Sequence, residues 1–137
     1  MSNLSSLEKL KLEKFFEMSG GYVFDFSNRT FQEFIKDNCG IDIYNQKYEY
    51  ESGSKANRLR AFWNKEPNHN VGKLICDLLD YWKAQKQIRA QDITAAEQNL
   101  CNECYKIADR LKKESTVESI EAIQPYAGDK DSSLLAK

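Results

Sequence analysis

Three groups of residues in this sequence have types and spacings that could support chemistry. They are the pair Cys101-x-x-Cys104, the only histidine (His69), and the carboxylates Asp77 and Asp80. A structural zinc site needs four ligands, and neither a second cysteine pair nor a histidine pair accompanies Cys101 and Cys104. Because these two cysteines stand at i and i+3 of an apolar helical pattern, we predict buried structural thiols rather than a metal or redox site.

The histidine and the two carboxylates have simpler explanations than catalysis. His69 follows a Pro-Asn turn, and no Gly-x-Ser-x-Gly elbow, phosphate-binding glycine loop or His-Glu-x-x-His helix accompanies it. We interpret His69 as a capping or solvent-facing residue. Asp77 and Asp80 could serve a metal-dependent nuclease, which needs converging carboxylates, but two carboxylates one turn apart are common on helix surfaces. We therefore predict no catalytic residue, no metal and no cofactor.

The best binding candidate is a basic segment that contains a tryptophan. Its basic residues are Lys55, Arg58, Arg60, Lys65 and Lys73. Such side chains contact phosphates, and an aromatic ring can stack on an exposed base. However, Leu59, Phe62 and Trp63 share one helical face, which predicts that Trp63 packs inward and that the basic side chains point outward. That outward face can bind a protein partner or nucleic acid, and Glu66 and Asp77 dilute its charge.

An aromatic, acidic segment precedes this basic one. It holds Tyr44, Tyr48 and Tyr50 together with Glu49 and Glu51. Tyrosine offers a large contact area at low entropic cost and is enriched at interfaces, although packing over the domain's own core is the alternative. The two segments together define a candidate binding surface made of Tyr44, Tyr48, Tyr50, Lys55, Arg58, Arg60 and Lys65.

Charge and hydropathy exclude some classes of protein. The 137 residues include 20 Lys and Arg and 21 Asp and Glu, so the formal net charge of −1 excludes a polycation that binds nucleic acid with its whole surface. No apolar run approaches the roughly 20 residues that span a bilayer. The N-terminal segment lacks the continuous apolar stretch of a signal peptide. We expect a cytoplasmic protein without a membrane contact, whose four cysteines are reduced.

The first half of the chain predicts two helices joined by an aromatic linker. A capping box from Ser5 to Glu8 begins the first helix, with an apolar face of Leu4, Leu7, Leu10 or Lys11, and Phe15, and Gly20-Gly21 ends it. Residues 22–26 form the irregular linker, since no second strand is available for pairing. Ser27 or Asn28 begins a second helix that extends to about Asn38, with Phe31, Phe34 and Ile35 facing inward.

The second half predicts three further helices. The first covers Lys55 to about Lys65 and ends at Pro67. Asn68 or Asn70 then caps a helix from Val71 to about Lys86, whose stripe is the strongest in the chain: Val71, Leu74, Ile75, Leu78, Leu79 and Trp82. A second capping box, Thr94 to Glu97, precedes a seam made of Leu100, Cys104, Ile107 and Leu111. This seam is too short for a coiled coil and indicates a helix packed on the core.

About five helices without alternating strands predict an all-α fold, a compact bundle with an irregular aromatic linker. From Ser115 onward the apolar density falls, and Pro125, Gly128 and a charged cluster follow. We therefore predict a helical domain at residues 1–114 and a linker or disordered, flexible tail at residues 115–137.

The stretch GGYVFDFSNRTFQEFIKDNCGIDIYNQKYEYESGSKANRLRAFWNKEP, followed by VGKLICDLLDYW, resembles the N-terminal domain of bacterial abortive-infection (phage-defence) proteins. The resemblance covers Leu7 to Trp82 and extends into the helix ending at Lys113. In such proteins a second helical domain of the HEPN ribonuclease-like type usually follows, with an Arg-x(4–6)-His motif. Here His69 lies nine positions after Arg60, so the resemblance implies an N-terminal module without the catalytic part, whose tail begins an interdomain linker.

The chain is also similar, more loosely, to death-fold-like adaptor domains of bacterial conflict systems. The residues that fit their apolar skeleton are Phe31, Phe34, Cys39, Ile41, Ile43, Leu59, Phe62, Leu74, Leu78 and Leu79. This similarity implies a protein–protein adaptor.

These observations lead to two hypotheses about function. The first is a non-catalytic interaction or sensor module of a phage-defence protein, which binds a protein partner or an adjoining effector domain through the Tyr44–Lys65 surface. The alternative is a nucleic-acid-binding domain that uses the basic helix Lys55–Lys65. The sequence does not indicate an oligomeric state.

Overall fold

The computed structural model describes the backbone of residues 1–123 and the side chains of residues 1–114. Within the described part, five α-helices and two short 3₁₀ turns account for the regular structure, and no strand is present. The elements are α1 (Ser6–Phe15), η1 (Ser19–Gly21), α2 (Asn28–Cys39), η2 (Gln46–Tyr48), α3 (Lys55–Lys65), α4 (Asn68–Ile88) and α5 (Ala95–Ile123). The predicted all-α bundle is confirmed.

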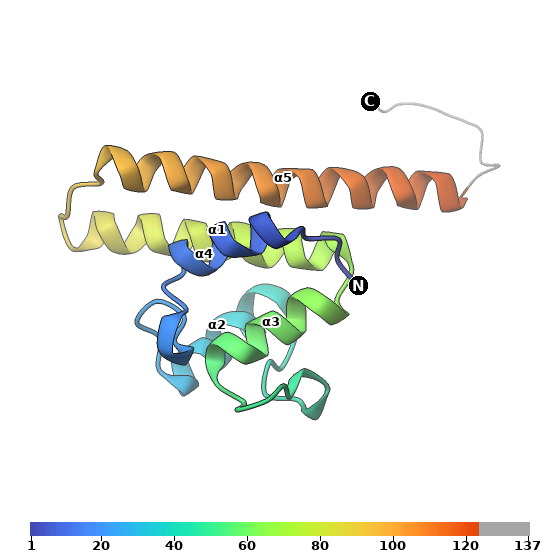
Figure 1. Cartoon of the computed structure of the whole chain (residues 1–137), viewed down its shortest axis with the longest axis horizontal. Helices are drawn as coiled ribbons and strands as arrows, with labels where there is room; N and C mark the ends of the chain where they lie inside the picture. Colours follow the sequence, from blue (N-terminus) through green and yellow to red (C-terminus); the bar gives the residue numbers. More distant parts are fainter. Residues whose placement is uncertain (124–137) are drawn as a thin grey trace.

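An antiparallel hairpin of α4 and α5 forms the upper layer of the molecule, above α2 and α3 (Figure 1). The predicted stripe of α4 is buried from Val71 to Leu79, and on α5 the seam residues Cys104, Ile107 and Leu111 are buried against it. The two helices lie close together at Gly72, where an added Cβ would lie 2.9 Å from the carbonyl oxygen of Ala108. Glycine therefore sets the spacing of the hairpin.

Helix α1 begins at the predicted capping box and packs beside the hairpin. Ser5 Oγ accepts from the Glu8 N–H, and the Glu8 carboxylate accepts from the Ser5 N–H. Its buried face consists of Leu12 and Phe15, followed by Phe16 at the C-cap. The predicted apolar face was wrong in part, because Leu7 and Leu10 are 62% and 64% exposed on the outer side of the helix.

The segments between the helices are irregular but packed. In the linker at residues 22–26, Val23 and Phe26 are buried without forming a strand, as predicted. Ser27 caps α2 by accepting from the Thr30 N–H. The predicted cap of α4 was wrong: Pro67 is the N-cap residue, and helix α4 already includes Asn68. The buried Asn68 side chain instead accepts from the backbone N–H of Asn3.

Helix α5 begins at Ala95, directly after Thr94 of the predicted Thr94–Glu97 capping box, whose two reciprocal hydrogen bonds measure 3.0 and 3.1 Å. Its backbone continues to Ile123, past residue 114, where we expected the helical domain to end. The rest of the predicted tail, residues 124–137, lies outside the described residues. No helix in the described part is long and apolar enough to cross a membrane.

Candidate interaction surface

The structure divides the seven predicted binding residues into two groups. Tyr48 and Arg58 are buried, and Tyr44 is half-buried beneath Arg58. The outward-facing group contains Tyr50, which is 42% exposed, and Lys65, which is exposed, while Lys55 is half-buried. Arg60 is half-buried in an ion pair. The predicted surface therefore has an inner layer that holds it in place and an outer layer that a partner can reach.

The prediction that Arg58 points outward was wrong, because this side chain is only 8% exposed. Its guanidinium Nη1 donates to the carbonyl oxygens of Ile43 and Asn45, at 3.0 and 3.2 Å. The guanidinium also lies over the Tyr44 ring, 4.6 Å from its centroid. Arg58 thus ties helix α3 to the loop at residues 41–51, hereafter the tyrosine loop.

A second buried charge anchors the other end of the tyrosine loop. Glu66 accepts from the Tyr48 hydroxyl at 2.5 Å and from Asn70 at 3.0 Å, and its carboxylate lies 2.8 Å from the Lys47 ammonium. Burial alone would raise the pKa of Glu66, but the hydrogen bonds from Lys47, Tyr48 and Asn70 outweigh it and lower the pKa. The carboxylate stays ionised at neutral pH.

The pKa values of the Tyr48 and Tyr44 hydroxyls are also shifted by the buried environment of the tyrosine loop. Burial, and then the hydrogen bond to the ionised Glu66, raise the pKa of Tyr48. Burial raises the pKa of Tyr44 as well. Both phenols are therefore neutral at physiological pH, and Tyr48 acts as a hydrogen-bond donor inside the fold.

The basic face of α3 is smaller than the sequence suggested. Arg60 Nε lies 3.0 Å from a carboxylate oxygen of Glu13, and its Nη1 donates to Asn57. Lys55 donates to the Asn28 side chain at 3.3 Å. Trp63 is 1% exposed and packs inward as predicted, so its ring cannot stack on a base. On α3, Lys65 is left as the exposed basic residue.

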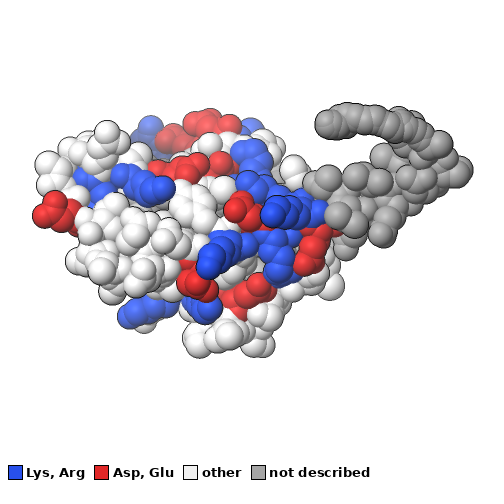
Figure 2. All heavy atoms as spheres, turned by 90° about the horizontal axis from the view of Figure 1, so that it is seen from above, with Lys and Arg blue, Asp and Glu red and all other residues white. Residues whose placement is uncertain are grey.

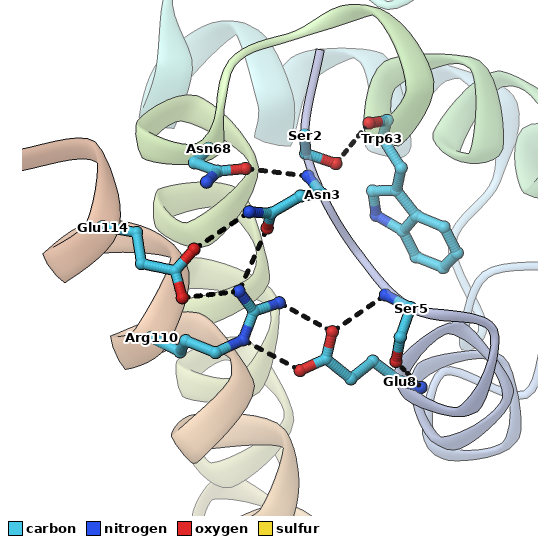
Figure 3. A network of polar contacts seen from close by, with 8 residues as sticks. All are labelled: Ser2, Asn3, Ser5, Glu8, Trp63, Asn68, Arg110 and Glu114. Carbon is cyan, nitrogen blue, oxygen red and sulfur yellow. Dashed lines mark hydrogen bonds and ion pairs between the residues drawn. The ribbon is translucent and has the colours of Figure 1, made fainter. Parts of the chain in front are cut away.

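The face around α5 is no better suited to a polyanion. In Figure 2, which views that face from above, Lys and Arg side chains are interspersed with Asp and Glu. Arg110 is typical, since it makes a two-pronged ion pair with Glu8 and a further one with Glu114 (Figure 3). Asn3 joins this network by accepting from Arg110 and donating to Glu114. The network fastens the N-terminal segment to α5.

The residues first considered for chemistry are dispersed in the structure. Cys101 and Cys104 are both buried, as predicted, and burial raises the pKa of the Cys104 thiol to about 12. Asp77 pairs with Lys73 at 2.7 Å, and Asp80 accepts from the Tyr105 hydroxyl. His69 is exposed at the start of α4. Within the described residues, no three His, Cys, Asp or Glu side chains converge as metal ligands would.

One hollow in the surface was not predicted from the sequence patterns. It lies beside the C-terminal end of α4, at the left in Figure 1, and has a volume of about 200 Å³. Glu17, Asp25, Trp82 and Glu97 come from four separate segments to line it. Spacing in the sequence cannot reveal such a site. The only local signal was the Tyr81-Trp82 pair beside the charged end of α4.

No family model, curated protein or solved structure matches this chain. The resemblance to abortive-infection proteins therefore depends on the sequence pattern quoted above.

Proposed function

We propose that this chain is a non-catalytic helical interaction module of a phage-defence protein, and that it binds a protein partner through the outer layer of the Tyr44–Lys65 surface. The observation that carries the proposal is the use of two buried charged side chains, Arg58 and Glu66, to hold the tyrosine loop in one conformation. The phage-defence setting follows from the sequence resemblance.

Burying a charged group is unfavourable unless it is well paired, and such groups can serve conformational specificity more than stability. Arg58 is an extreme case, because its nearest carboxylate oxygen, on Glu49, lies 4.0 Å away. The Arg58 Nε and the Tyr44 hydroxyl are also buried without a hydrogen-bond partner among the described residues. A loop that only connected α2 to α3 would not need this arrangement. A loop with a preformed binding shape would benefit from it, because a preorganised loop loses less entropy on binding.

The outer layer of the surface suits a protein better than a nucleic acid. The tyrosine loop presents Tyr50 between the exposed carboxylates of Glu49 and Glu51, and Lys65 lies at the far end of α3. An exposed aromatic residue flanked by charged side chains is typical of a protein interface, which has aromatic anchors and a polar rim. Nucleic-acid binding by α3, the alternative, would require several outward basic side chains. It predicts a gel shift at low salt that weakens steeply as salt rises.

The test is phage restriction in bacteria that express the native gene. We expect Y50A/E51K to weaken partner binding about tenfold, as for a typical aromatic hot spot, and to reduce restriction while leaving the melting temperature unchanged. The matched control is L10A/D109K, which also truncates one exposed apolar side chain and reverses one exposed acid. Equal restriction by the two variants would refute the binding surface. Absence of restriction by the wild-type protein would refute the phage-defence setting.

A further inference from the structure

The hollow beside the C-terminal end of α4 has the features of a specific binding pocket. Its wall is aromatic, formed by the half-buried rings of Phe24, Tyr81 and Trp82. These rings are held from behind: Phe15 packs edge-on against Trp82 with centroids 4.8 Å apart, and Phe26 stacks on Tyr81 at 4.5 Å. The wall is therefore rigid before any ligand arrives.

The backbone around the pocket is held in unusual conformations. Phe24 has φ of +48° and Glu17 has φ of +56°, and both line the pocket. Ala90, with φ of +54°, lies between the two lining residues Arg89 and Gln91. A left-handed conformation costs a non-glycine residue on the order of 1 kcal/mol, and such positions cluster at functional sites.

The charge of the pocket favours a cation. Three carboxylates and two cationic groups line it, giving a formal charge of −1. Asp25 is paired with Arg89 at 2.9 Å, and Glu97 with Lys86 at 3.3 Å. The Glu17 carboxylate has no hydrogen bond or ion pair with any described residue. A cationic ligand would therefore meet one uncompensated carboxylate.

The wall and the rim indicate which cation fits. The Lys86 ammonium lies 5.5 Å from the centroid of the Trp82 ring, within cation–π range, so this ring already has a cation as a neighbour. A planar guanidinium stacks on aromatic rings more readily than an ammonium does. Its five N–H donors also need several acceptors, and Gln85 and Gln91, whose side chains carry carbonyl acceptors, are lining residues together with Glu17.

The size of the pocket and its surroundings indicate that the guanidinium belongs to a protein. About 200 Å³ is below the roughly 300–1,000 Å³ of typical small-molecule sites, so it suits one side chain. Ile88, which precedes the lining residue Arg89 in the chain, is 75% exposed and is therefore accessible to a molecule larger than one side chain. We propose that this pocket is a receptor for an arginine side chain of a partner protein. This proposal is independent of the tyrosine loop and of the function proposed above.

The two tryptophans provide a direct test by two-dimensional NMR of the indole N–H signals. The probe is N-acetyl-arginine amide, titrated to roughly 50 mM because a single side chain binds in the millimolar range. We expect a saturable shift of the Trp82 signal and a constant Trp63 signal, since Trp63 is buried elsewhere. N-acetyl-citrulline amide, which has the same shape without the charge, should produce no saturable shift. Equal shifts with the two probes, or no saturation with arginine, would overturn the proposal.

Two variants locate the binding charge. E17Q should raise the dissociation constant for the arginine probe about fivefold, in line with loss of one exposed ion pair. D37N is the matched control, because Asp37 is also an exposed acid, lies on α2 and does not line the pocket. If E17Q binds as the wild type does, the assignment of Glu17 is wrong.

A final comparison distinguishes a protein partner from a free cationic metabolite. The peptide acetyl-Leu-Arg-Leu-amide adds apolar contacts that Ile88 can meet, so it should bind more tightly than the blocked single residue. Equal affinity for the peptide, the blocked residue and the guanidinium ion would show that the pocket recognises only the cationic group. That result would overturn the assignment to a protein partner.

Discussion

Arg58 provides the sharpest test of the structure, because the sequence pattern and the fold predict opposite behaviour. An outward-pointing arginine could be replaced by alanine with a stability change within about 0.5 kcal/mol. In the fold, R58A removes two hydrogen bonds from a charged donor, each worth about 1.5–3 kcal/mol, and the contact with the Tyr44 ring. Part of this loss is offset, because the variant no longer has a guanidinium group to desolvate on folding.

We therefore expect R58A to lower the free energy of unfolding by about 2–4 kcal/mol. For a domain of this size, that corresponds to a fall in Tm of roughly 10 °C. The assay is thermal and urea denaturation followed by circular dichroism. R58M keeps the apolar stem without the guanidinium, so its stability should lie between those of the wild type and R58A.

Two further measurements connect this loss to the tyrosine loop. K65A, which truncates an exposed basic residue on the same helix, should leave Tm nearly unchanged. In R58A, trypsin should cut at Lys47 faster than in the wild type, because the carbonyl groups of Ile43 and Asn45 lose their donor. A fall in Tm below about 3 °C together with unchanged cleavage would refute the role assigned to Arg58.

Three other predictions follow from the packing and the charges. In urea denaturation, G72A should lower the free energy of unfolding by about 1–3 kcal/mol, because the added Cβ meets the Ala108 carbonyl oxygen. This loss exceeds the gain of about 1 kcal/mol in helix propensity. A more stable variant would contradict the prediction. Burial raises the pKa of Glu8, but hydrogen bonds from Arg110 and Ser5 outweigh this effect and lower the pKa. The ionised carboxylate therefore stabilises the fold above about pH 4.3, and this stabilisation is lost as the pH falls through the lowered pKa. The free energy of unfolding of E8Q should consequently fall less steeply with acid than that of the wild type. When the native protein is treated with iodoacetamide and followed by mass spectrometry, Cys101 and Cys104 should be modified far more slowly than the half-buried Cys76; equal rates would show that the α4–α5 seam is open.

Local signals in the sequence were sufficient for most of the fold. The capping boxes at Ser5 and Thr94 depend on contacts three residues apart, so they could be predicted without knowing the tertiary structure. The stripe of α4 was equally clear, because one face of that helix meets α5 and the core. Tertiary contacts decided the rest: Asn68, a predicted cap of α4, lies inside the helix, and its side chain accepts from the N-terminal segment instead.

The candidate site could be predicted only in outline, and α3 shows why. Periodicity assumes that a helix has one buried face and one exposed face. Helix α3 is instead covered on two sides, by the core at Leu59 and Phe62 and by the tyrosine loop at Arg58. A loop has no periodic pattern, so residue spacing could not indicate that it covers a helix. The same limit applies to α1, where Leu7 and Leu10 fitted an apolar face but Leu12 and Phe16 are buried.

The two proposed binding sites lie apart: the tyrosine loop is at the bottom of Figure 1, and the pocket is lined by the C-terminal end of α4, which is at the left of that view. Both sites contain an irregular segment held either by buried charged groups or by residues in a left-handed conformation, and both features are unfavourable in free energy. For the loop these are Arg58 and Glu66, and for the pocket they are the left-handed residues Glu17 and Phe24. A core of buried aliphatic and aromatic side chains already stabilises the hairpin and α1. We therefore attribute the buried charges and the left-handed residues to fixing the shape of the two surfaces rather than to stabilising the fold. Single substitutions in the two sites should therefore change binding independently of each other, since residues that share no partner behave additively.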